Sequence, residues 1–93
     1  MTESGPIARM IHQKLTEAFA PQRLEVVDDS NRHQGHAGHR EGGESHFNVL
    51  LESQAFAGVG RVARQRQVHA VLAEELAGPV HALSVKALAP GEA

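Results

Sequence analysis

The first apolar positions of the chain recur at intervals of three and four residues. They are Ile7, Met10, Ile11, Leu15, Ala18 and Phe19. A stripe with this period forms one face of an amphipathic helix, and that face is expected to lie against a core. The run Ser4, Gly5 and Pro6 is typical of a helix start. Because Pro21 cannot continue a helix, the pattern predicts one helix between these two signals.

Three later segments alternate between apolar and polar or small side chains, which is the period of a strand. They are residues 24–30, 45–52 and 80–88. One face of the second segment carries Phe47, Val49 and Leu51, and one face of the third carries His81, Leu83 and Val85. We expect the first two strands to pair as a hairpin with a long connection.

Residues 61–77 carry the strongest helix signal in the chain. The side chains expected to face inward are Val68, Val71, Leu72 and Leu76. Gly78 followed by Pro79 is typical of a helix end. Glu74 and Glu75 would then lie near the C-terminal end, where the helix dipole disfavours acidic side chains. The order of helix, strand, strand, helix and strand predicts an α+β fold, a small mixed three-stranded sheet with helices on one face.

The connection between the first two strands, residues 30–44, contains four glycines and no large apolar side chain. We therefore expect a mobile loop within a single domain that spans residues 1–93 and has an ordered core of about residues 6–88. Loops of this length in compact domains are disproportionately binding loops or disordered inserts. This one carries His33, His36 and His39.

Composition narrows the classes of function. The 93 residues are 41% apolar and 22% charged, as in a folded globular domain. Cysteine is absent, which excludes disulfides, thiolate nucleophiles and metal sites built from the chain's own cysteines. The sequence shows neither a membrane-length apolar run nor the pattern of a signal peptide, so we expect a cytoplasmic protein with no membrane partner. The net charge of −2 lacks the basic excess usual in nucleic-acid-binding domains.

Several separate stretches resemble the BolA family, from Ile7 to about Pro90. They are residues 24–30 (LEVVDDS), the histidine-bearing loop, 45–49 (SHFNV), 56–58 (FAG), 64–66 (RQR), 72–76 (LAEEL) and 80–83 (VHAL). The family fold is similar to a type II KH domain, with the order α-β-β-α-β predicted above. The Gly-x-x-Gly phosphate clamp of nucleic-acid-binding KH domains is missing.

This resemblance implies a function in iron–sulfur chemistry. BolA-like proteins bind a monothiol glutaredoxin as a heterodimer and share a [2Fe-2S] cluster with it, in cluster trafficking or iron regulation. The resemblance places one cluster ligand on His81 and the second on His33, with His36 and His39 as alternative loop ligands. The remaining ligands would be a cysteine of the partner and glutathione supplied through the partner. Two imidazoles on one iron are an established cluster ligation.

Two other interpretations stay open. The three loop histidines could chelate a single zinc, nickel or copper ion, or they could simply be solvated. Arg61, Arg64 and Arg66 could form a basic patch on the second helix that contacts an acidic partner or DNA, or they could be a solvated face. Since some bacterial BolA proteins are treated as DNA-binding transcriptional regulators, a DNA-binding regulator that uses residues 61–66 is the alternative function.

An enzyme is not expected. Ser45 with His46, and Asp28 with Asp29, supply residue types that occur in catalytic sites. Neighbouring residues on a strand point to opposite faces, so neither pair forms a catalytic set by itself.

Overall fold

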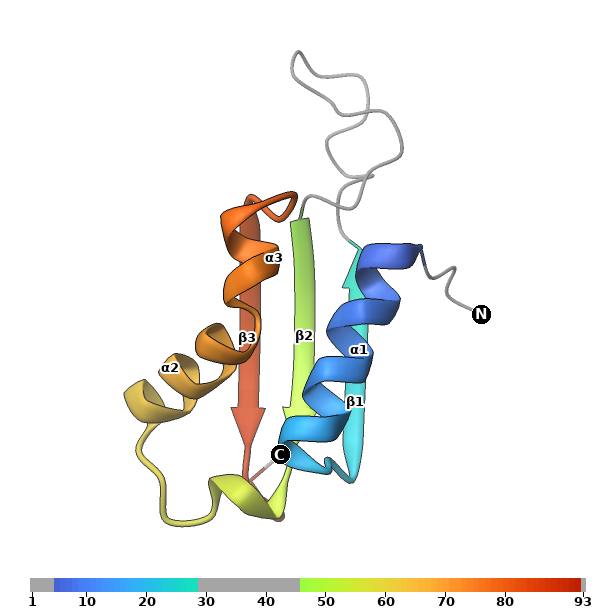
Figure 1. Cartoon of the computed structure of the whole chain (residues 1–93). Helices are drawn as coiled ribbons and strands as arrows, with labels where there is room; N and C mark the ends of the chain where they lie inside the picture. Colours follow the sequence, from blue (N-terminus) through green and yellow to red (C-terminus); the bar gives the residue numbers. More distant parts are fainter. Residues whose placement is uncertain (1–4, 29–45, 93) are drawn as a thin grey trace.

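The computed structural model describes residues 5–28 and 46–92. Its elements in chain order are α1 (Pro6–Phe19), β1 (Arg23–Asp28), β2 (His46–Glu52), the 3-10 helix η2 (Gln54–Phe56), α2 (Arg61–Val71), α3 (Ala73–Ala77) and β3 (Ala82–Leu88). The three strands form one sheet in the order β1-β2-β3, in which β2 is antiparallel to β1 and parallel to β3. The helices lie on one face of this sheet (Figure 1). The predicted α+β fold with a mixed sheet is therefore confirmed.

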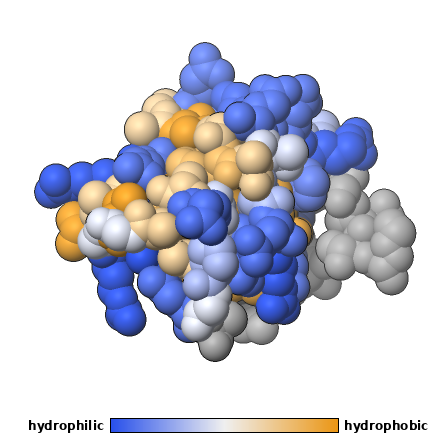
Figure 2. Space-filling view, turned by 90° about the horizontal axis from the view of Figure 1, so that it is seen from below, coloured by the Kyte–Doolittle hydropathy of each residue, from blue (hydrophilic) through white to orange (hydrophobic). Residues whose placement is uncertain are grey.

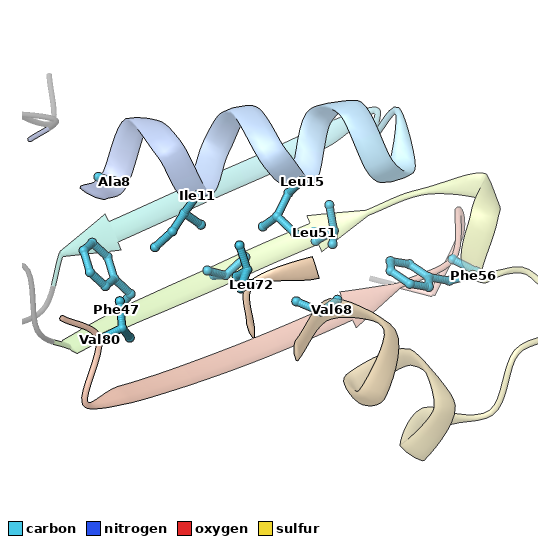
Figure 3. Packing of buried hydrophobic residues seen from close by; sticks show 11 residues of the cluster. Ala8, Ile11, Leu15, Phe47, Leu51, Phe56, Val68, Leu72 and Val80 are labelled. Carbon is cyan, nitrogen blue, oxygen red and sulfur yellow. The ribbon is translucent and has the colours of Figure 1, made fainter. Parts of the chain in front are cut away.

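The core lies between the helices and the central strand. Its buried side chains include Ala8, Ile11 and Leu15 of α1, Phe47, Val49 and Leu51 of β2, and Phe56, Val68, Leu72 and Val80 of the second half. Figure 3 shows that the side chains of α1 and those of the second half approach the same face of the sheet. The prediction that Met10 faces the core is wrong, because this residue is 47% exposed. A residue next to Ile11 is turned by about 100° around the helix axis and so points away from the buried side.

The predicted helix over residues 61–77 is two helices. At Leu72 the backbone leaves the helical region, with φ −102° and ψ 21°, and α3 then runs at an angle to α2 along β3 (Figure 1). The break places Glu74 and Glu75 in the first turn of α3, where the helix dipole favours acidic side chains. The prediction that they lie at an unfavourable helix end is wrong for this reason.

Lys14 connects α1 to α3. Its Nζ lies 3.0 Å from Oε1 of Glu74 and 2.8 Å from Oε2 of Glu75. Glu75 is buried, so this carboxylate is compensated by the ammonium group that it contacts. The hydrogen bond to Glu75, followed by the one to Glu74, raises the pKa of Lys14 above its usual value.

The end of the molecule at which β3 finishes is a mixed surface. Figure 2 shows apolar residues gathered near the middle of this end, with hydrophilic side chains around them. In the described ranges, the large apolar side chains that are exposed are Met10, Val27 and Val62. Within residues 5–28 and 46–92, no helix is long and apolar enough to cross a membrane.

Candidate functional site

One end of the sheet brings the start of β3 to the ends of the long connection. β1 finishes at Asp28 and β2 begins at His46. Because β2 and β3 are parallel and His46 pairs with Ala82, the start of β3 lies beside the start of β2 (Figure 1). His81 directly precedes Ala82. The connection therefore re-enters the described structure at His46, beside the start of β3 and His81, and it leaves at Asp28 on the far side of β2, at the same end of the sheet.

His81 is exposed on a well-anchored stretch of backbone. The preceding residue, Val80, is buried, and its N–H donates to the carbonyl oxygen of Glu75 at 2.9 Å. The prediction that His81 shares a strand face with Leu83 and Val85 is wrong, because β3 begins only at Ala82. The chain is still held against the end of α3 at Val80, so the imidazole projects from the edge of the fold rather than into the core.

The other predicted ligands, His33, His36 and His39, lie outside the described residues. In the described ranges, no group of three or more histidine, cysteine, aspartate or glutamate side chains could hold a metal ion. Among the four predicted ligands, the structure therefore gives the position of His81.

The prediction that Arg64 belongs to an exposed basic patch on α2 is wrong, because this residue is only 7% exposed. Its Nε donates to the carbonyl oxygen of Val59 at 2.7 Å, and its Nη1 donates to that of Ala87 at 3.1 Å. Its position four residues before Val68, on the same side of the helix, directs it toward the sheet. Arg61 and Arg66 are exposed, as predicted.

Glu92 completes the environment of Arg64. Two side-chain nitrogens of Arg64 donate to the two oxygens of this carboxylate, at 2.6 and 3.0 Å. The N–H of Ala89 donates to Oε1 of Glu92 at 2.9 Å. The guanidinium, followed by this backbone donor, lowers the pKa of Glu92 to about 2, and the same pairing raises the pKa of Arg64. The segment after β3 is thus attached to α2.

Comparison with known proteins places this arrangement in a family. The family model described as BolA-like protein matches residues 15–92. The chain belongs to the BolA family. Human BolA-like protein 1 is 46% identical over 88 residues, which cover 95% of this chain and 61% of the human protein. The DNA-binding transcriptional regulator BolA of Escherichia coli (strain K12) is 47% identical over 79 residues, which cover 85% of this chain and 71% of that protein.

A solved BolA structure has the same fold. The BolA domain of SufE1 from Arabidopsis thaliana superposes with a TM-score of 0.86 and 38% identity, and the match covers 98% of this chain and all of that domain. The family resemblance predicted from the sequence is therefore confirmed, together with the α+β fold. In this BolA chain, the pairing of Arg64 with Glu92 has no signal in the sequence, since no local pattern connects an arginine on a helix with a glutamate after a distant strand.

Proposed function

We propose that this BolA-family chain is a non-enzymatic adaptor that forms a heterodimer with a monothiol glutaredoxin. In the complex, His81 and one histidine of the connection between β1 and β2 would ligate a shared [2Fe-2S] cluster, for cluster trafficking or iron regulation. The observation that carries this proposal is the exposed position of His81 at the end of the sheet where the connection that contains His33, His36 and His39 leaves β1 and enters β2.

The donor set of the chain suits a shared cluster. It has seven histidines and no cysteine, so it can supply imidazoles but no thiolate. Imidazole is an established ligand of iron in [2Fe-2S] clusters, and thiolates make up the rest of such a set. The thiolates would come from a cysteine of the glutaredoxin and from glutathione supplied through it. When bound, the cluster supplies the redox-active or transferable iron–sulfur group.

The fold would orient the side chain of His81 for cluster binding. The anchored backbone at Val80 fixes the direction from which His81 emerges, while its exposure leaves the ring accessible to a second protein. A fixed ligand on one side of the site reduces the conformational entropy lost when the cluster binds.

Anaerobic reconstitution with a monothiol glutaredoxin and glutathione tests the proposal. Visible absorption and circular dichroism would be compared for the wild type and for His81→Ala, with His12→Ala as the control, because His12 is an exposed histidine on α1. We expect a spectrum distinct from that of the glutaredoxin homodimer, lost in His81→Ala and kept in the control. A spectrum identical to that of the homodimer in every sample would refute cluster sharing.

The loop ligand is assigned by the same assay. Alanine variants of His33, His36 and His39 are made one at a time. We expect His33→Ala to alter the mixed spectrum most. If it leaves the spectrum unchanged while one of the other two alters it, the second ligand is that histidine.

A second candidate function is DNA binding by α2. It is favoured by the exposure of Arg61 and Arg66 on one helix and by the name of the E. coli relative. Fluorescence anisotropy with duplex DNA at two salt concentrations tests it. Because each phosphate contact releases counterions, neutralising either arginine should weaken binding and reduce the salt dependence by about one unit of slope. Equal affinity of the wild type and Arg61→Gln would argue against this function.

A further inference from the structure

A cleft lies between α2 and the second half of β3. It has a volume of about 200 Å³. Its lining residues are Arg61, Arg64, Gln65, Val85, Lys86, Ala87, Leu88 and Glu92. Lys86 of β3 lies five residues after His81 in the chain, which corresponds to about 16 Å of extended backbone. The cleft is therefore separate from the proposed cluster site.

The charged side chains of the cleft are mostly positive. Arg61, Arg64 and Lys86 line it together with a single carboxylate, that of Glu92. Glu92 is paired with Arg64. Neither Arg61 nor Lys86 is in an ion pair with any residue of the described ranges 5–28 and 46–92. Two positive charges from different elements thus line one recess, and the single carboxylate there is paired with Arg64.

The contacts of Glu92 show which chemistry the cleft accepts. Its carboxylate accepts two hydrogen bonds from Arg64 and one from the backbone N–H of Ala89, so the donors at this side of the cleft already hold one oxyanion group. Arg61 also contributes to the lowered pKa of Glu92, so its positive charge acts within the cleft. Gln65 Nε2 donates to the carbonyl oxygen of Val85 at 2.8 Å and holds the wall of α2 against β3.

We infer that this cleft binds a small doubly charged oxyanion, free phosphate, between Arg61 and Lys86. The charge of the ion matches these two cations, which form no ion pair within residues 5–28 and 46–92. The cleft is several times larger than the roughly 30 Å³ that a water molecule occupies in the liquid, so it has room for such an ion beside Glu92. A nucleic-acid backbone fits less well, because its phosphates carry one charge each and the acidic Glu92 stands in the same recess.

Titration of ¹⁵N-labelled protein with inorganic phosphate tests the site, with sodium chloride adjusted to keep the ionic strength constant. We expect saturable shifts of the amides of residues 61–65 and 85–88, with a Kd on the order of 1 mM. Arg61→Gln and Lys86→Gln should each weaken binding roughly tenfold, since each removes a charge-assisted hydrogen bond. Arg66→Gln is the matched control, because Arg66 is exposed on the same helix but does not line the cleft, and it should keep the wild-type affinity.

Two further experiments distinguish a specific phosphate site from a general attraction of anions to positive charge. Sulfate, which has the same shape and charge, should compete with phosphate, whereas acetate should bind more weakly. Glu92→Gln removes the resident negative charge and should bind phosphate more tightly than the wild type. Non-saturable shifts, or equal weakening by Arg66→Gln and Arg61→Gln, would overturn the inference. Cluster reconstitution with Arg61→Gln should remain normal, so failure of this site is distinguishable from failure of the proposed function.

Discussion

Ser53 is the residue whose removal should reveal most about how the first helix is attached to the sheet. It is 1% exposed and follows directly after β2. Its hydroxyl donates to the carbonyl oxygen of Phe19 at 2.6 Å and accepts from the N–H of Ala55 at 3.0 Å. Phe19 ends α1, and the last carbonyls of a helix have no partner within it. One side chain thus satisfies the end of α1 and caps η2.

Replacing Ser53 with alanine removes both hydrogen bonds and creates almost no cavity, because only one oxygen atom is lost. Loss of a cap costs about 0.5–2 kcal/mol, and a buried carbonyl left without a donor costs about 1–3 kcal/mol. We therefore expect Ser53→Ala to lower the free energy of unfolding by about 2–4 kcal/mol. For a domain of this size, that loss corresponds to a fall in Tm of roughly 10 °C or more.

Urea denaturation followed by far-UV circular dichroism measures this change. Ser84→Ala is the control, because Ser84 is an exposed serine on β3 and undergoes the same chemical change. It should stay within about 0.5 kcal/mol of the wild type. If Ser53→Ala loses less than about 1 kcal/mol at an unchanged m value, the two hydrogen bonds do not anchor α1 and the reasoning is refuted.

Three other predictions concern a core leucine, a glycine with positive φ and the ion pair of Glu92. Leu51→Ala, at a fully buried position of β2, should lower the free energy of unfolding by about 2–5 kcal/mol in the same assay. Gly58 has φ +77°, so Gly58→Ala should cost about 1 kcal/mol in the same assay. The pKa of Glu92 falls from 4.5 in its ordinary state to about 2 when paired with Arg64, so the pairing stabilises the fold above pH 4.5 and is lost as the pH falls toward 2. Unfolding of the wild type and of Glu92→Gln should therefore differ at pH 7 and converge near pH 2; a constant difference would contradict the ion pair.

The sequence by itself determined the class of fold. Apolar residues at intervals of three to four predicted α1, and alternation predicted the three strands, because these periods follow directly from helix and strand geometry. The stretches that resemble the BolA family also identified His81 as the candidate ligand. These inferences needed only residues that are close in the sequence or arranged in a known order.

The boundaries and sides of the elements were less well determined. Met10 has the correct spacing for the stripe, yet it is exposed. The apolar pattern of residues 61–77 runs through the break at Leu72, because Val68 before the break and Leu76 after it both pack in the core with Leu72. Periodicity reports which residues tend to be buried, but it does not report the direction in which a neighbouring element lies.

Only the tertiary structure decided which charged groups meet. Arg64 and Glu92 are 28 residues apart, and Lys14 and Glu75 are 61 residues apart. In the sequence, each of these residues could equally belong to a solvated face, because nothing local distinguishes a paired charge from an exposed one. The same holds for the position of His81 beside the start of β2, where the long connection ends, since it results from the parallel pairing of β2 with β3. Such contacts depend on how whole elements pack, and this packing minimises buried, uncompensated charge over the entire fold.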